Sequence, residues 1–193
     1  MLKLKLATDP RWVNLAEKNI SDILTDHAYC EQKAATSCIS LIIVYPDLKP
    51  IVESLTPIVR EEWSHFSMVL KEIYTRGYVL GYPRKDEYVN ELLNFQNKNG
   101  KREEVLVEKL LTNALIEARS CERFRLLSLE LKDTYLQKFY HHFMISEAGH
   151  YKLFMDLAKI YKNESYVNNR WEDYLNYEKE IFDKIIIRGD RMH

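Results

Sequence analysis

Apolar residues recur at steps of three and four along most of this chain, a spacing that places side chains on one face of an α-helix. The pattern predicts four long helices, at about 11–45, 50–76, 102–131 and 133–161. A short helix is expected near 86–95 and a final one over about 172–187. Five Gly and five Pro are few for a fold with many strands, so we expect an all-α protein.

Turn-forming residues divide the predicted helices into two pairs. Pro46 and Pro50 separate the first helix from the second, and only Lys132 and its neighbours separate the third from the fourth. Between the two pairs lies a long crossover, about 77–101, which contains three Gly and one Pro. One long crossover between helices two and three is typical of a ferritin-like four-helix bundle, here with an extra C-terminal helix.

Two Glu-x-x-His motifs stand out within these helices. Glu62 and His65 form the first, and Glu147 and His150 form the second. Residues three apart project from the same helical face, so each motif presents a carboxylate and an imidazole together. One such pair is weak evidence of a site, because surface helices produce it by chance.

A lone Glu precedes each motif at nearly the same distance. Glu31 lies 31 residues before Glu62, and Glu117 lies 30 residues before Glu147. Both fall on the apolar stripe of their helix, where a solvated carboxylate is not expected. The repeated arrangement is much stronger evidence of a common site than either motif alone.

A four-helix bundle with this inventory holds two metal ions in its core. Unpaired burial of four carboxylates would cost several kcal/mol each, whereas two divalent cations balance their charge. Carboxylates with one imidazole per metal suit iron, and also manganese. We therefore expect two iron ions, with manganese as the alternative, bound by Glu31, Glu62, His65, Glu117, Glu147 and His150.

Three other residues near these motifs are not expected to be metal ligands. Glu122 lies off the main stripe and is expected to be a surface or supporting carboxylate. His27 lies one turn before Glu31, as a supporting partner or a packed histidine. Val69 occupies the position one turn after His65 where reductase-type diiron proteins carry a radical Tyr, which argues against a radical generator.

Composition excludes several classes of protein. The formal net charge is −1, so RNA binding would require a local basic patch. Three Cys without a C-x-x-C pair argue against a disulfide framework or a Cys-rich metal site. No apolar run has the length of a membrane span, and no signal peptide is evident. We expect a single domain, 1–193, in the cytoplasm; the sequence does not specify its oligomeric state.

Four longer strings carry a family resemblance. They are residues 26–31 (DHAYCE), 60–66 (REEWSHF), 115–124 (LIEARSCERF) and 146–150 (SEAGH). With these strings the sequence resembles the MiaE-type tRNA hydroxylases over essentially its whole length. The resemblance implies a nonhaem diiron monooxygenase that uses O2 and reducing equivalents from an electron-transfer partner. Its substrate would be the isopentenyl group of a hypermodified adenosine beside the tRNA anticodon. It also implies that Glu62 and Glu147 bridge the two irons.

The tRNA-binding residues are less evident from the sequence. Basic and aromatic residues mix near the crossover, and we expect Arg76, Tyr82, Arg84 and Lys85 to contact RNA by stacking and by phosphate binding. A solvated loop with buried Tyr explains them equally well. Alternatives for the whole protein are a rubrerythrin-like peroxidase or manganese catalase, iron storage, and a non-enzymatic helical protein.

Overall fold

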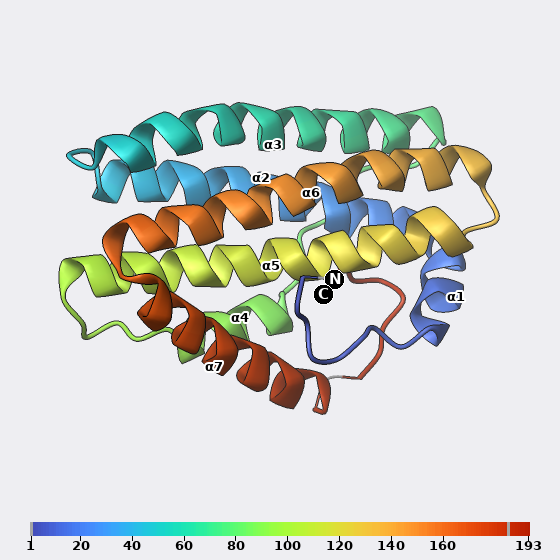
Figure 1. Ribbon diagram of the computed structural model, residues 1–193. Helices are drawn as coiled ribbons and strands as arrows, with labels where there is room; N and C mark the ends of the chain where they lie inside the picture. The colour runs from blue at the N-terminus through green and yellow to red at the C-terminus, as the bar shows by residue number, and fades with distance from the viewer. Residues whose placement is uncertain (1, 185) are drawn as a thin grey trace. The chain divides into compact units, whose positions relative to one another are not determined.

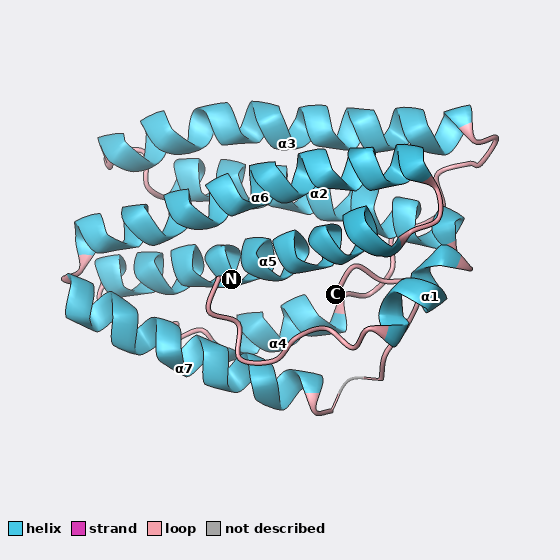
Figure 2. Ribbon diagram, turned by 45° about the vertical axis from the view of Figure 1, so that its right-hand side comes forward, coloured by secondary structure: helices cyan, strands magenta, loops and turns pink. Residues whose placement is uncertain are grey.

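The computed structural model describes residues 2–184 and 186–193, and this part of the chain forms helices and no strand (Figure 1, Figure 2). Contacts between residues divide the chain into two compact units. The α2–α3 unit contains residues 11–85 and 188–192, and the α5–α6 unit contains the described residues of 2–10, 86–187 and 193. Among the described helices, none combines the length and the apolar character needed to cross a membrane.

The α2–α3 unit is a helical hairpin preceded by a short helix. It contains α1 (Arg11–Glu17), α2 (Ile20–Val44) and α3 (Lys49–Thr75). The long helices α2 and α3 run side by side in opposite directions (Figure 1). Pro50 lies in the first turn of α3, where a missing N–H costs nothing. Pro57 lies inside α3 without ending it, so the helix begins early, at Lys49.

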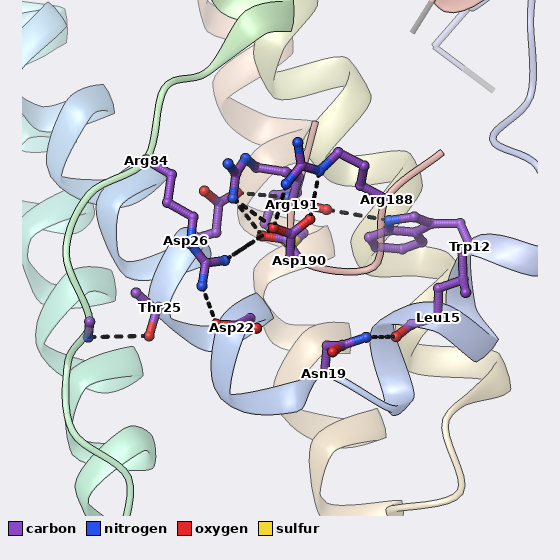
Figure 3. A network of polar contacts seen from close by, with 12 residues as sticks. Trp12, Leu15, Asn19, Asp22, Thr25, Asp26, Arg84, Arg188, Asp190 and Arg191 are labelled. Carbon is purple, nitrogen blue, oxygen red and sulfur yellow. Dashed lines mark hydrogen bonds and ion pairs between the residues drawn. The ribbon is translucent and has the colours of Figure 1, made fainter. Parts of the chain in front are cut away.

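Residues 188–192 return to this unit and bind the start of α2 (Figure 3). The backbone N–H of Met192 donates to Asp26 Oδ2 at 2.7 Å. Arg84 donates to the carbonyl of Asp190 at 3.0 Å and also to the carboxylate of Asp22. The segment therefore ties the end of the crossover, through Arg84, to the first turns of α2.

The α5–α6 unit is a second helical hairpin with two accessory helices. Its elements are α4 (Glu87–Phe95), α5 (Arg102–Glu130), α6 (Thr134–Tyr161) and α7 (Glu164–Phe182). Asp133 begins α6 by accepting hydrogen bonds from the N–H groups of Tyr135 and Leu136. Helix α7 packs against α4, α5 and α6 (Figure 1).

A buried ion pair joins α5 to α7. Arg119 is fully buried, and its Nε donates to Glu178 Oε1 at 2.9 Å. Its other nitrogens bind Glu122 and the carbonyl of Leu6. Burial opposes the charge on Arg119, but attraction to Glu178 and the hydrogen bond outweigh burial and raise the pKa of the guanidinium. Arg119 is therefore held in an internal ion pair within the α5–α6 unit.

Two of the predicted helices have different boundaries in the structure. The first predicted helix is two helices, because the chain turns at Asn19, whose side chain donates to the carbonyl of Leu15 at 2.8 Å (Figure 3). The final helix begins at Glu164 instead of 172, because Asn163 caps it by accepting from Tyr166 N–H at 2.9 Å. It ends at Phe182; of the residues predicted to extend it, 185 lies outside the described part.

Replacing Arg119 by Met should destabilise the protein strongly. The substitution keeps the volume but leaves the carboxylate of Glu178 buried without its guanidinium partner. Breaking a buried pair from one side costs about 3–5 kcal/mol in the free energy of unfolding. Urea unfolding followed by circular dichroism measures it. Lys152→Met is the control, because it breaks the exposed pair with Asp156, worth about 0–1 kcal/mol. Equal losses in the two variants would contradict the interpretation.

Candidate metal centre

The α2–α3 unit buries two carboxylates and an imidazole within its hairpin. Glu31 comes from α2, and Glu62 and His65 come from α3; their exposed fractions are 4, 1 and 3 %. His65 Nδ1 lies 3.2 Å from Glu31 Oε2 and 3.7 Å from Glu62 Oε2. One donor atom from each residue falls within 4.8 Å of the other two, close enough to bind one cation.

The α5–α6 unit repeats this arrangement. Glu117 comes from α5, and Glu147 and His150 come from α6, all of them buried. His150 Nδ1 lies 3.4 Å from Glu147 Oε2, and the donor atoms of the three residues again fall within 4.8 Å of one another. The six residues singled out in the sequence therefore form two sets of three, one in each hairpin.

The helical period explains why each set comes together. A Glu-x-x-His motif spans three residues, so both side chains leave α3 or α6 on the same face. That face is also the apolar stripe, which packs against the antiparallel neighbour in the hairpin. The lone Glu lies on the corresponding stripe of the neighbour, so close packing of two apolar stripes brings the carboxylates together.

The donor sets fit a divalent metal. Each set offers carboxylate oxygens and one imidazole nitrogen, and two ionised carboxylates balance one divalent charge. Oxygen and nitrogen donors without thiolate suit iron, manganese or zinc. Within the described part of the chain, Glu147 Oε2 is buried and accepts no hydrogen bond, as expected for an atom placed for a cation.

His27 supports Glu31 rather than standing apart from the cluster. Its side chain is fully buried, and its Nε2 lies 2.7 Å from Glu31 Oε1. The sequence left His27 open between a supporting partner and a packed histidine; the structure shows a buried histidine that hydrogen-bonds Glu31. A hydrogen bond of this kind fixes which oxygen of a carboxylate faces a metal.

Glu122 lies outside the two sets, as predicted, and so does Glu61. Glu122 Oε1 accepts from Thr8 N–H at 2.8 Å, and its Oε2 accepts from Arg119 at 2.5 Å. Glu61 is partly exposed on α3, with its carboxylate 3.9 Å from His65 Nε2.

The four residues predicted to contact RNA divide into two groups. Arg76 pairs with Glu72 at 2.5 Å, and Arg84 is bound to Asp22 and Asp190 in the network of Figure 3. Both guanidinium groups therefore have structural roles within the α2–α3 unit. Tyr82 is 92 % exposed and Lys85 is exposed as well, so their side chains are accessible to a partner.

Two thiols near the ligands had no assigned role in the sequence analysis. Burial and then the negative charge of Glu62 raise the pKa of the Cys38 thiol to about 12. Burial and the charge of Glu147 raise the pKa of the Cys121 thiol to about 11. The sequence did contain a signal for this proximity: Cys38 lies seven residues after Glu31 and Cys121 four after Glu117, so each thiol is on the same helical face as a predicted ligand.

Helical hairpins that each bury a Glu and a Glu-x-x-His define a class, the ferritin-like dimetal carboxylate proteins. The structure agrees: it matches a solved chain described as "Protein 43 with aldehyde deformylating oxygenase activity from Synechococcus". The TM-score is 0.93 and the identity 31 %, over 98 % of this chain and 94 % of that one. The predicted all-α, ferritin-like fold class is confirmed.

The family model described as tRNA-(MS[2]IO[6]A)-hydroxylase (MiaE) matches residues 2–193, so the chain belongs to this family. Two similar proteins are both named tRNA 2-(methylsulfanyl)-N(6)-isopentenyladenosine(37) hydroxylase. The one from Pseudomonas putida is 35 % identical over 158 residues, 82 % of this chain and 76 % of the relative. The one from Salmonella typhimurium is 26 % identical over 237 residues, 97 % of this chain and 85 % of the relative. The resemblance inferred from the sequence is confirmed.

The raised pKa values predict slow labelling of two thiols in the metal-free protein. At pH 8, roughly one Cys38 in ten thousand and one Cys121 in a thousand would be thiolate. Cys30 is partly exposed, so Ellman's reagent should modify it first, with the other two reacting only as the pH rises or the protein unfolds. Peptide mass analysis identifies the modified thiols. Similar rates for all three at pH 8 would contradict the assignment.

Proposed function

We propose that this protein is a diiron monooxygenase that hydroxylates the isopentenyl group of the hypermodified adenosine beside the tRNA anticodon. The observation that carries the proposal is the pair of buried Glu and Glu-x-x-His sets, in a chain that the tRNA hydroxylase family matches over 2–193. The names of the two relatives support the same substrate. Such a reaction belongs in the cytoplasm, where tRNA is modified.

The six buried residues are proposed to be the ones that would hold two metal ions, with Glu62 and Glu147 among the ligands. The ferritin-like template supports this, because its core takes one Glu from each of two helices and Glu-x-x-His from the other two. Two divalent ions also neutralise four carboxylates that would otherwise be costly to bury. Iron is the proposed metal, because a reduced iron pair activates O2 for insertion into a C–H bond. Nothing in the comparisons supports manganese.

The overall reaction requires a separate reductant. One C–H bond, one O2, two electrons and two protons give one C–OH and one water. An electron-transfer protein is proposed to supply the electrons, since no side chain can supply them. The chain itself holds the carboxylates in place, fixes Glu31 through His27, and surrounds both sets with apolar residues that exclude water.

A peroxidase, a catalase or a storage protein could have the same helical fold, but the family match and the names of the relatives do not support these functions. A peroxidase or a manganese catalase would need no RNA, whereas the family and both relatives carry a tRNA hydroxylase name. Iron storage needs no second Glu-x-x-His set. We therefore retain the hydroxylase as the single proposed function.

Iron-loaded protein, reduced without air and then given O2, should add one oxygen to tRNA that bears the isopentenylated adenosine. Nucleoside mass analysis measures the product. Glu117→Ala and Glu147→Ala should each bind less iron and lose the product, because each removes a carboxylate ligand. Glu53→Ala, which changes an exposed carboxylate on α3, is the control and should keep both. Two bound irons per chain with no product would contradict the function, while full iron binding by Glu147→Ala would contradict the site.

His27→Phe should weaken iron binding by about 10–100-fold, the usual effect of losing a hydrogen bond to a metal ligand. His27→Gln restores a donor toward Glu31 and should recover much of the affinity. Competition with a chelator measures both, and circular dichroism verifies the fold. If Phe and Gln weakened iron binding equally, His27 would be a packing residue only.

A further inference from the structure

The face of α3 that points away from its packed stripe carries a row of two aromatic residues and three others, which are exposed except for the half-buried Leu70. Their spacing of three and four residues places them on one side of the helix. The row consists of Trp63, Ser67, Leu70, Lys71 and Tyr74, and we call it the α3 outer face. Trp63 is 51 % exposed and Tyr74 58 %.

This face is hollowed and continues into the crossover. Ser67, Leu70, Lys71, Tyr74 and Thr75 line an open hollow of about 480 Å³. After the helix ends, Tyr78 and Tyr82 are exposed by 37 and 92 %. Large aromatic side chains are costly to expose, and so many in one stretch mark an interaction surface.

The exposed charged residues between Trp63 and Lys85 are all basic. Between Trp63 and Lys85 the sole acidic residue is Glu72, which is buried and paired with Arg76. Every exposed side chain in the stretch is therefore neutral or basic. Within the described part of the chain, neither Lys71 nor Lys85 has an ion-pair partner. Both lysines are therefore available to bind an anion, whereas Arg60, one turn before the row, is separated from it by Glu61 and Glu62.

We propose that the α3 outer face, together with Tyr78, Tyr82 and Lys85, binds the single-stranded anticodon loop of the substrate tRNA. Exposed aromatic rings stack on unpaired bases, and neighbouring cations bind the phosphates between them. Because the exposed charges from Trp63 to Lys85 are basic, this stretch complements the negative charge of RNA. This inference rests on the proposed function, because it assigns the surface that holds the proposed substrate.

The location suits a loop whose modified base must reach the metal ligands. Trp63 directly follows Glu62 in α3 and lies two residues before His65, within the same helical turn. An α-helix with its side chains is about 10–12 Å wide. Nucleotides stacked on the outer face would thus lie within one helix width of two proposed ligands, and a neighbouring nucleotide could extend past the helix.

Tryptophan fluorescence tests the surface directly. Trp12 is fully buried and Trp171 is 3 % exposed, so Trp63 is the exposed one of the three in the chain. Titration of iron-loaded protein with an anticodon stem-loop RNA that carries the isopentenylated adenosine should quench the fluorescence of Trp63. Trp63→Phe should bind with similar affinity but without the quenching, because Phe still stacks.

Removing side chains from the α3 outer face should weaken RNA binding, whereas removing similar side chains from α6 should not. Trp63→Ala and Tyr74→Ala should each raise the Kd about 5–100-fold, the loss expected for one stacked base. Lys71→Gln should lower the slope of log affinity against log salt by about one. Tyr135→Ala and Lys138→Gln, exposed residues of the same types on α6, are matched controls and should change neither. Thermal unfolding verifies that all variants fold.

The outcomes separate this inference from the proposed function. Unchanged Kd and salt slope in the three variants, while wild-type protein still forms product, would overturn the surface and leave the hydroxylase standing. Unchanged RNA binding, with turnover lost under a protein reductant but kept under a chemical one, would assign the face to the electron donor and overturn the inference. Absence of product in the wild type would overturn the function, whatever the variants bind.

Discussion

The burial of carboxylates within each hairpin is the constraint on which the rest of the structure depends. Glu31 and Glu62 in one unit, and Glu117 and Glu147 in the other, lie at positions that apolar residues would normally occupy. One imidazole lies near the carboxylates in each unit, His65 beside Glu62 and His150 beside Glu147. A single imidazole carries at most one positive charge, which is less than the charge of two carboxylates. Burial of a carboxylate carries a desolvation cost, which a bound divalent cation would offset. The proposed metal would therefore stabilise the folded core as well as supply the chemistry.

Elsewhere the chain compensates buried charge with its own cations, and the contrast is informative. Glu178 is paired with Arg119, and Glu108 with Arg170, at 2.9 and 2.7 Å. Both pairs tie α7 to α5, so they stabilise the accessory helix without approaching the ligand stripes. Two kinds of buried carboxylate therefore coexist in the α5–α6 unit. Those paired with Arg fix the packing, and those near imidazole remain available to a metal.

Periodicity was sufficient to predict the long helices and the six buried residues, because both follow from the same apolar stripes. It could not predict the break at Asn19 or the early start of α7, since each is made by one side-chain hydrogen bond that leaves the hydrophobic pattern unchanged. Nor could it place residues 188–192 against α2, because contacts between distant segments leave no periodic signal. Metal binding by the six residues stays a prediction, as does a single domain.

Helix α3 has two chemically distinct faces, and if one of them binds RNA as proposed, the net charge of the chain is a poor guide to that binding. One face carries Glu62 and His65 among apolar residues, and the other exposes aromatic rings and Lys71. A net charge of −1 is a sum over the whole surface, whereas a phosphate responds to charges within about a Debye length of 8–10 Å. Between Trp63 and Lys85 the sole acidic residue is the buried Glu72, so the acidic residues that lower the sum lie almost entirely outside this stretch. Segregation of charge, and not its total, decides whether such a protein can hold RNA.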